Sequence, residues 1–267
     1  MSKFPLSIAI IGNNGRMGRM FTKRFHNVGL SVQGIDSSLP SQGSFQEALA
    51  GTIQQCQVVM LCVPVSALER LLPVLAPLLL PHQILVDITS VKVVPMRLME
   101  RYFQGSVVGT HPLFGPAPTP QDMRTILVQG THASSDHCAL VESLFTQIGS
   151  QVHWSSAMEH DEGVAFAQSL NFAVSAAFFS TLKHQKNIEH FLTPSFKRHL
   201  EAARKHLTED TAMFLEFSGM NPCFPAALET YAATLERVKK GQLPAVAHEA
   251  QKWYSLNKVQ GEQGDKG

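Results

Sequence analysis

The sequence predicts an α/β fold in which a doubly wound, mostly parallel sheet is followed by a second, all-helical domain. Over the first half of the chain, short runs that are apolar throughout alternate with helical stretches, which is how parallel strands covered on both faces appear in a sequence. The second half shows helical stretches that break at Pro194, at 219–225 and at 241–244. A chain of 267 residues is long enough for both domains.

The predicted strands divide the chain and set the domain boundary. The last strand lies around Gln151 to Trp154, so we expect a first domain over 1–154 and a second over 155–267. A helix is expected from about Arg19 to Asn27, after the first strand. The predicted strands are 6–11, 30–35, 58–63, 84–87, 107–110, 126–128 and 151–154.

A glycine-rich loop follows the first predicted strand and leads into this helix. In the dinucleotide-binding fingerprint, glycines permit a tight turn, a close approach of backbone to pyrophosphate and the packing of helix on strand, while the helix N-terminus faces the phosphates. Gly15 and Gly18 occupy the second and third glycine positions, and Asn13 replaces the first. Because Asn tolerates the left-handed region, the turn is expected to survive this replacement. The context predicts a Rossmann-type dinucleotide site.

An acidic residue ends the second predicted strand. Asp36 lies about 20 residues beyond the loop, where a carboxylate accepts hydrogen bonds from the ribose hydroxyls of NAD and repels the additional phosphate of NADP. NAD is therefore the predicted cofactor. Ligands of doubly wound sheets bind at the carboxyl ends of strands, so the end of the third strand is expected to line the same site. The predicted cofactor-binding residues are Gly12, Asn13, Gly15, Arg16, Met17, Gly18, Asp36, Val63 and Pro64.

A single histidine, His111, stands where an apolar run meets a turn rich in Pro and Gly. An α/β enzyme presents reacting side chains at such strand tips, and imidazole takes up a proton near neutral pH. Ser90 and Pro64 also follow strand ends, so the three residues could surround one crevice. His111 is the candidate general base, and Ser90 could orient the imidazole or a substrate hydroxyl. The alternatives are a strand-end histidine bonded to backbone and a serine that only caps a helix.

Three ordered motifs give a more specific indication: Asp87 to Lys92, His111 to Pro116, and Glu159-His160-Asp161 followed by Gln168. With these motifs, the chain from about 7 to at least 254 resembles the prephenate dehydrogenase family. The resemblance implies oxidative decarboxylation of prephenate to 4-hydroxyphenylpyruvate in tyrosine biosynthesis, with NAD as hydride acceptor. It also implies that His111 is the catalytic histidine and that Ser90 is its hydrogen-bonding companion near the substrate hydroxyl.

The resemblance also indicates which residues bind the substrate. Family members commonly use an arginine of the helical domain to clamp a substrate carboxylate, and Lys205 matches that position, with Arg204 beside it. Lys supplies the charge without the two-pronged geometry of Arg. Phe172 replaces a second substrate-contacting histidine of many relatives, which leaves both prephenate and arogenate open as substrates. The candidate substrate-binding residues are His160, Gln168, Arg204 and Lys205.

These four residues also have purely structural interpretations. Arg204 and Lys205 lie in a basic helical segment that could be a solvated helix face. His160 and Gln168 are about two helical turns apart and could share a face, but they could equally be hydrogen-bonded core residues.

The composition argues against several classes of function. A net charge of +1 without a basic run argues against nucleic acid and anionic membranes as partners, and favours a small-molecule substrate. The four cysteines have no paired spacing, so neither a metal site nor a disulfide framework is expected. The apolar stretch at the N-terminus is short and leads directly into the glycine loop, so we expect no signal sequence and a cytoplasmic location.

The segment 163–182 is uncharged and long enough to cross a bilayer. It also contains polar residues, including Gln168, Ser169 and Asn171, which argue against a membrane span. Such a helix is more typical of the centre of a helical bundle or of a subunit interface. We therefore expect it to begin the second domain and to form a homodimer with its counterpart.

Two other functions remain open. A β-hydroxyacid dehydrogenase or an imine reductase would share the glycine loop and a helical second domain, but the hydroxyacid enzymes use a lysine on the interdomain helix, and Lys183 lies too far along the chain. A non-catalytic nucleotide-binding relative would keep the fold without turnover, and the replacements at Asn13, Phe172 and Lys205 fit that alternative. The intact motif around His111 favours an enzyme.

Overall fold

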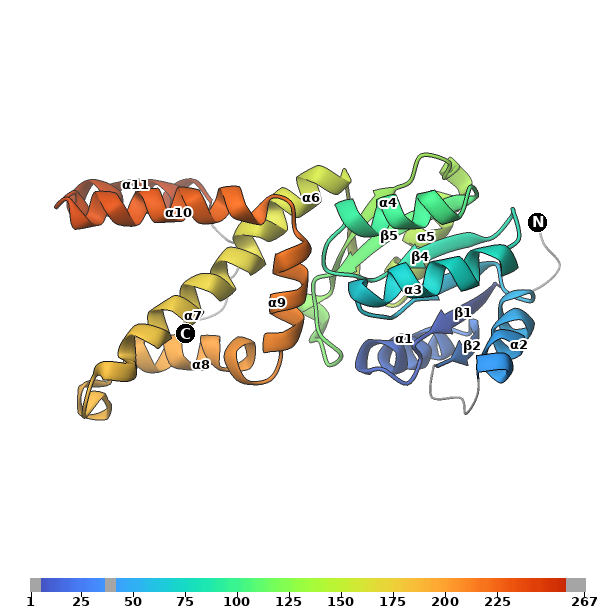
Figure 1. The fold of residues 1–267 in the computed structure, drawn as a ribbon, viewed down its shortest axis with the longest axis horizontal. Helices are drawn as coiled ribbons and strands as arrows, with labels where there is room; N and C mark the ends of the chain where they lie inside the picture. The colour runs from blue at the N-terminus through green and yellow to red at the C-terminus, as the bar shows by residue number, and fades with distance from the viewer. Residues whose placement is uncertain (1–5, 37–41, 258–267) are drawn as a thin grey trace, which may run out of the picture. The chain divides into compact units, whose positions relative to one another are not determined.

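The computed structural model describes residues 6–36 and 42–257 (Figure 1). The chain forms two compact units, Met1–Pro222 and Cys223–Gly267. The first unit contains the sheet, its covering helices and the helices that follow it, and residues 223–257 of the second form two helices. The predicted boundary between 154 and 155 lies inside the first unit and stays a prediction.

The described residues of the first unit form a seven-stranded sheet. Its strands are β1 (Ser7–Ile11), β2 (Ser31–Ile35), β3 (Val58–Leu61), β4 (Ile84–Asp87), β5 (Ser106–Pro112), β6 (Arg124–Gln129) and β7 (Gln151–Ser155). The strand order is β2-β1-β3-β4-β5-β6-β7, and every neighbouring pair is parallel except β5 with β6. The chain therefore winds outward from β1 in both directions, as the sequence predicts, and the carboxyl ends of β1, β3, β4 and β5 share one edge.

Helices connect most of the strands and make up the remaining chain. Those within the sheet region are α1 (Arg16–Asn27), α2 (Gln42–Ile53), α3 (Val65–Leu75), α4 (Val93–Tyr102) and α5 (Ser135–Gln147). After β7 the first unit continues with α6 (Ala157–Val164), a π-helix (Ala165–Leu170), α7 (Asn171–Thr181), α8 (Pro194–Thr208) and α9 (Thr211–Met220). The second unit consists of α10 (Phe224–Lys239) and α11 (Leu243–Leu256). Short 3₁₀ turns cover Ala76–Leu78, Pro120–Asp122, Leu182–His184 and Ile188–Phe191.

The sheet is covered on both faces. Helices α1 and α5 pack on one face, where the rings of Phe21 and Phe145 meet edge to face with centroids 5.8 Å apart. Helices α2, α3 and α4 pack on the other face, where Leu49, Leu68 and Met99 are fully buried. Because both faces are covered, β3 and β4 are buried along their whole length, and this explains their uninterrupted apolar runs.

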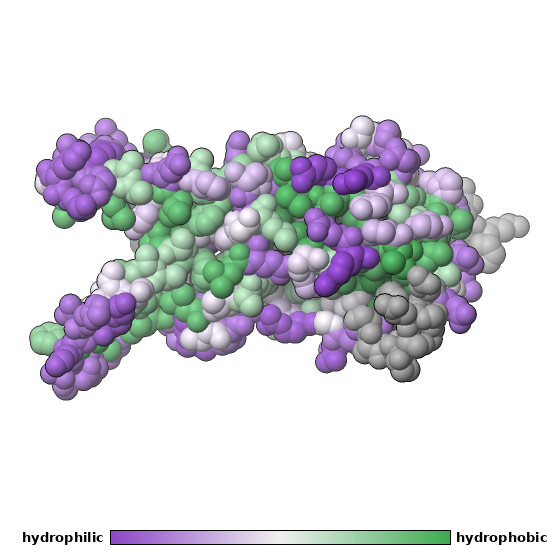
Figure 2. Space-filling view, viewed as in Figure 1, coloured by the Kyte–Doolittle hydropathy of each residue, from purple (hydrophilic) through white to green (hydrophobic). Residues whose placement is uncertain are grey.

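Helix α6, the π-helix and α7 continue into one another as a long helix, Ala157–His184 (Figure 1). By length and composition this long helix could span a membrane, and 28% of its most apolar window is buried. Met158, Phe166 and Phe178 are exposed on it, and Figure 2 shows hydrophobic surface over this part of the molecule. The long helix therefore presents apolar side chains outward.

Some boundaries differ from the predictions. The sequence predicts that the fifth strand ends at Thr110, but β5 continues to Pro112, and His111 pairs with Ile126 of β6. The antiparallel partner extends the ladder past the apolar run, so polarity does not mark the strand end. The long helix begins at Ala157 rather than at 163, because Ser156 and Glu159 form a capping box there. The predicted helix breaks near Pro194, 219–225 and 241–244 are confirmed.

The turn between β1 and α1 differs from the prediction in one respect. The left-handed residue is Gly12, with φ +86°, and not Asn13. A Cβ on Gly12 would lie 2.4 Å from the carbonyl oxygen of Cys62, so a side chain does not fit there. Asn13 instead packs against β2, where a Cβ on Gly34 would lie 2.2 Å from Asn13 Nδ2. The missing first glycine of the fingerprint is therefore accommodated by Gly34 on the neighbouring strand.

Gly18 packs the start of α1 against this turn. A Cβ on Gly18 would lie 2.2 Å from the carbonyl oxygen of Gly12 and 2.7 Å from Cα of Asn13. We expect Gly18→Ala to lower the free energy of unfolding by about 1–3 kcal/mol, because these backbone atoms move only if the turn opens. Gly51→Ala, which introduces a Cβ into open space in α2, is the control and should raise that free energy by up to about 1 kcal/mol. Urea denaturation measures both, and equal changes would contradict the expectation.

Candidate active site

The predicted cofactor-binding residues meet at the carboxyl ends of β1, β2 and β3. Gly15 is the N-cap of α1 and no side chain caps this helix, so the helix N-terminus offers backbone N–H groups to an anionic ligand. Asp36 follows β2 and accepts a hydrogen bond from the backbone nitrogen of Asn14 at 3.2 Å. At the end of β3, Val63 packs against the glycine turn and Pro64 is the N-cap of α3. These residues surround one edge of the sheet.

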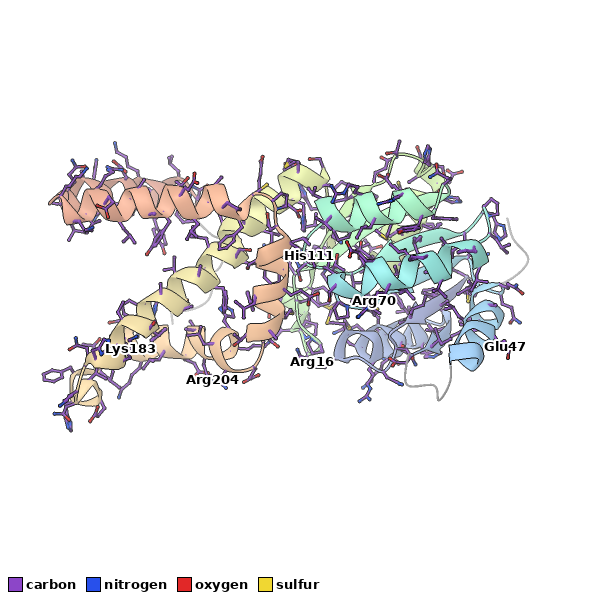
Figure 3. All side chains as sticks on the ribbon, viewed as in Figure 1. Arg16, Glu47, Arg70, His111, Lys183 and Arg204 are labelled. Atoms are coloured by element: carbon purple, nitrogen blue, oxygen red, sulfur yellow. The ribbon has the colours of Figure 1, made fainter. Side chains whose placement is uncertain are left out.

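His111 lies near the end of β5, where the sheet meets the helices that follow β7 (Figure 3). Its side chain is buried, with 4% exposed. The Nδ1 atom lies 2.8 Å from Nε2 of His160 on α6, and the two ring centroids are 5.0 Å apart. The Nε2 atom of His111 has no hydrogen-bond partner within residues 6–36 and 42–257. One imidazole nitrogen is therefore engaged and the other remains for a ligand.

Asp161 holds His160 from the other side. Its Oδ1 lies 2.7 Å from Nδ1 of His160, and the carboxylate also accepts hydrogen bonds from the backbone nitrogens of Lys92 and Val93, at 2.7 and 2.9 Å. These bonds satisfy donors at the N-terminus of α4, which has no cap of its own. The carbonyl oxygen of Asp161 accepts a hydrogen bond from Asn221 Nδ2 at 2.8 Å. Asp161 thus connects α4, α6 and the end of α9.

Burial has the largest effect on the pKa values of His111, His160 and Lys92. It lowers the pKa of His111 well below the ordinary histidine value, and the charges of His160 and Lys92 lower it further. Burial also lowers the pKa of His160, although the hydrogen bond with Asp161 opposes this. The pKa of Lys92 is lowered by burial and raised by its pairing with Asp87. Both imidazoles are therefore neutral at neutral pH, as a general base must be.

A fully buried ion pair lies behind the imidazoles. Lys92 Nζ is 2.5 Å from Asp87 Oδ2, and Lys92 also contacts the hydroxyl of Thr89 at 3.2 Å. The Asp87 carboxylate accepts hydrogen bonds from the backbone nitrogens of Thr89 and Thr110, at 2.9 and 3.3 Å. These two threonines directly precede the two predicted catalytic residues. One carboxylate therefore anchors the backbone of both segments.

Three further predicted residues do not join this hydrogen-bonded network. Ser90 is half-buried, and within the described residues its hydroxyl makes no hydrogen bond with His111. Gln168 is half-buried in the π-helix, and Met17, in the first turn of α1, packs against the core. Phe172, at the position of the second family histidine, is buried and stacks on the ring of Phe214 with centroids 5.2 Å apart; it is not part of the network either.

The two candidate cations of α8 have different surroundings. Lys205 Nζ lies 3.6 Å from Asp210 Oδ2, and a Cβ on Gly115, in the turn after β5, would lie 3.4 Å from the same nitrogen. Asp210 also accepts a hydrogen bond from Arg16 Nη2 at 2.8 Å, which links α8 and α9 to the glycine loop. Arg204 is exposed and pairs with two glutamates, at 3.2 and 2.9 Å (Figure 3). Lys205 thus faces the site, and Arg204 forms surface ion pairs.

Comparison with known proteins shows similarity to prephenate and arogenate dehydrogenases. Residues 41–153 match the family model for the nucleotide-binding domain of prephenate dehydrogenase. The T-protein of Enterobacter agglomerans is 26% identical over 259 residues, or 92% of this chain. A probable arogenate/prephenate dehydrogenase of Methanocaldococcus jannaschii is 23% identical over 248 residues, or 86% of this chain. Residues 41–153 therefore match the nucleotide-binding domain of the prephenate dehydrogenases, and the longer alignments show similarity to these relatives over most of the chain.

The chain spans only part of the length of its curated relatives but nearly the whole length of a similar solved structure. The chain spans 67% of the length of the T-protein and 55% of the archaeal dehydrogenase. The structure of prephenate dehydrogenase from A. aeolicus in complex with hydroxyphenyl propionate and NAD+ matches with a TM-score of 0.77 and 19% identity, covering 97% of this chain and 98% of that one. This match confirms the predicted fold. The match to the family model places the similarity to the nucleotide-binding domain of prephenate dehydrogenase in the sheet region, at residues 41–153.

Lys183 lies far from the candidate site. It follows α7 at the opposite end of the long helix from His160, about 35 Å away at 1.5 Å per residue. Figure 3 shows Lys183 and His111 well separated. This position argues against the lysine-dependent mechanism of the hydroxyacid dehydrogenases.

Four charged residues of the site have roles that the sequence pattern does not predict: Asp87, Lys92, Asp161 and Asp210. The first three stand inside the family motifs, and Asp87 ends a strand that is otherwise apolar. A charged group in such a buried run needs a buried partner of opposite charge, so the position of Asp87 in the sequence indicates an ion pair. Asp210 lies between two helices without a comparable pattern.

Removing either charge of the buried pair should destabilise the protein. We expect Asp87→Asn and Lys92→Met each to lower the free energy of unfolding by about 3–5 kcal/mol, because an unpaired buried charge remains. The double variant should lose much less than the two single losses combined. Urea denaturation of all four proteins measures this coupling. Lys239→Met, which breaks an exposed pair, is the control and should leave the midpoint unchanged, and additive losses at Asp87 and Lys92 would contradict the expectation.

Proposed function

We propose that this protein is an NAD-dependent dehydrogenase that oxidises and decarboxylates prephenate to 4-hydroxyphenylpyruvate. The observation that carries the proposal is the buried, neutral imidazole of His111, whose Nδ1 is engaged and whose Nε2 is free. It lies at the same edge of the sheet as the glycine turn, because β1 and β5 run in the same direction. The similarity to prephenate and arogenate dehydrogenases supports this class of reaction.

The glycine turn fits the dinucleotide. Gly12 and Gly18 close the turn without side chains, and the uncapped N-terminus of α1 would hold the pyrophosphate. Asp36 would accept hydrogen bonds from the ribose hydroxyls and disfavour NADP. Val63 and Pro64, at the end of β3, would line the other side. When bound, NAD would accept a hydride from the ring carbon of the substrate.

The reacting hydroxyl sits on the carbon that loses hydride, and a carboxylate is bonded to the carbon across the ring. His111 takes the hydroxyl proton at Nε2, and the electron pair of the O–H bond forms the carbonyl as hydride leaves. The resulting dienone loses carbon dioxide, and the electron pair of the broken carbon–carbon bond makes the ring aromatic and its oxygen a phenolate. Return of the proton from His111 to this oxygen gives 4-hydroxyphenylpyruvate without a further catalytic group. The task of the protein is to keep the imidazole unprotonated and the reacting carbon in place.

Ser90 would orient the reacting hydroxyl. The backbone nitrogens of Thr89 and Thr110 both donate to Asp87, so the segments that carry Ser90 and His111 have one anchor. The hydroxyl of Ser90, with one donor and two acceptor positions, can bond the substrate oxygen while the imidazole receives its proton.

Lys205 would bind a substrate carboxylate. Its ammonium group lies beside Gly115, in the turn that follows β5, and is partly balanced by Asp210. Gln168 of the π-helix could add a neutral hydrogen bond. Arg204 is less suited to this role, because neighbouring glutamates already pair with it at the surface.

Arogenate is the second candidate substrate. The stacked rings of Phe172 and Phe214 lie where the family resemblance predicts a substrate-contacting histidine. An uncharged aromatic wall gives little preference between a pyruvyl side chain and an amino acid side chain. The name of the archaeal relative includes both substrates.

We also propose a cytoplasmic homodimer that forms through the helical region. The long helix exposes Phe166 and Phe178, and Leu215 of α9 is exposed as well. Contiguous apolar surface of this kind favours a second copy as its cover.

The proposed reaction is tested by following NADH formation with prephenate and with arogenate, each with NAD and with NADP. We expect turnover with NAD and almost none with NADP. His111→Asn should lower kcat by about 10²–10⁴-fold while NAD binding, measured by calorimetry, stays within about twofold. No turnover of either substrate by the unaltered protein, or near-normal turnover by His111→Asn, would overturn the proposal.

Lys205 and Arg204, which are adjacent on α8, allow a test variant and a matched control. Lys205→Ala should raise KM roughly 10-fold, equivalent to about 1.4 kcal/mol, with little change in kcat, because charge attraction to the substrate is lost. Lys205→Arg should restore KM, and Arg204→Ala should leave it unchanged. Steady-state kinetics with the better substrate measure all three. A larger effect at Arg204 would reverse the assignment.

A further inference from the structure

We propose that His160 and Asp161 act through His111, fixing its tautomer and receiving the proton that it takes from the substrate. The proposal rests on the proposed dehydrogenase reaction and deepens it. It gives His160 a positioning role in place of the substrate contact that the sequence suggests. The three side chains form a line, with 2.7 Å from Asp161 Oδ1 to His160 Nδ1 and 2.8 Å from His160 Nε2 to His111 Nδ1.

Asp161 determines which nitrogen of each imidazole carries hydrogen. Its carboxylate faces three groups, and two of them, the backbone nitrogens of Lys92 and Val93, can only donate. A carboxylate that accepts these bonds also accepts from His160, so His160 Nδ1 carries a hydrogen. Neutral His160 then has its lone pair on Nε2, and His111 must donate from Nδ1. The lone pair of His111 consequently lies on Nε2, where the substrate hydroxyl would bind.

The buried charges favour a proton on His160 over one on His111. His111 faces Lys92 and His160, and both disfavour a positive charge on it. His160 faces Lys92 as well, but it also faces Asp161 and Asp87, which favour its charged form. Lys92 already pairs with Asp87. Asp161 is therefore the carboxylate that an additional proton would balance.

The proposed transfer balances in two coupled steps. The O–H bond of the substrate breaks as an N–H bond forms at His111 Nε2. The Nδ1–H bond of His111 breaks as an N–H bond forms at His160 Nε2, so His111 is neutral again and His160 is an imidazolium bonded to Asp161. When carbon dioxide leaves, the electron pair of its bond makes the ring aromatic and the carbonyl oxygen becomes a phenolate. The two proton steps then reverse, and His111 Nε2 returns the proton to that oxygen.

In this proposal the helical region supplies two of the three side chains that hold the substrate proton. His160 and Asp161 belong to α6, whereas His111 belongs to β5 of the sheet. Asp161 also binds the start of α4 and, through its carbonyl oxygen, Asn221 after α9. Sheet and helices thus position one hydrogen-bonded chain together.

The tautomer is tested on the full chain labelled with ¹⁵N-histidine, without substrate. Nitrogen–proton correlation spectra should show His111 with its hydrogen on Nδ1, and His111→Asn identifies the signal. His160→Gln should keep this tautomer, because the amide oxygen can accept from Nδ1, whereas His160→Leu should release it. His111 with its hydrogen on Nε2 in the unaltered protein would overturn the positioning role, whatever the activity.

The relay is tested by kinetics of the same variants. His160→Gln cannot take a proton, so its kcat should fall about 10–100-fold with KM nearly unchanged. Removal of the neighbouring imidazole should also move the acidic limb of kcat/KM to higher pH, while Lys92, Asp87 and Asp161 remain. His153→Gln, at an exposed position on β7, is the control and should match the unaltered protein.

The outcomes separate the two proposals. A kcat and pH profile in His160→Gln equal to those of the unaltered protein would overturn the relay and leave the dehydrogenase reaction intact. Absence of turnover in the unaltered protein would overturn the dehydrogenase reaction and with it the relay, while the spectra would still decide the tautomer. Asp161→Asn gives a second measurement if His160→Gln does not fold, and it should lower kcat and leave His111 in a mixture of tautomers.

Discussion

Lys92, held by two buried carboxylates, is the residue on which the site depends. Its side chain pairs with Asp87 at the end of β4, and its backbone nitrogen donates to Asp161 of α6. The first contact involves the carboxylate that anchors the segments carrying Ser90 and His111, and the second joins the start of α4 to the long helix. Charges in a protein interior are tolerated only when they are paired and hydrogen-bonded. The positions of His111 and His160 are therefore fixed by the contacts of Lys92 with Asp87 and Asp161.

The sheet and the glycine turn could be predicted because their causes are local. Apolar runs identify strands that are covered on both faces, and Gly18 permits close packing at the start of α1. The charged network could not be derived in the same way, because its contacts join distant positions. His111 and His160 are 49 residues apart, and Arg16 and Asp210 are 194 apart. The end of β5 was misplaced for a similar reason, since β6 extends it beyond the apolar run.

Departures from the expected patterns have local compensation. Asn13 takes the place of a glycine, and Gly34 on β2 provides the space that its side chain needs. Lys205 takes the place of an arginine, and Asp210 holds it together with Arg16 of the glycine loop. In both cases the compensating residue lies on another element. A substitution at one of these positions should accordingly be considered together with its partner.

The π-helix Ala165–Leu170 lies in the middle of the long helix, between His160 and Phe172. A π-turn holds more residues than an α-turn, so this segment contains more chain than a regular helix of the same length would. Deletion of one residue here would restore α-helical geometry and leave the later side chains in their present register relative to His160. A deletion in an α-helical part of the long helix would instead rotate every later side chain by about 100°. The π-helix is thus the place where the long helix can lose a residue without turning Phe172 away from Phe214.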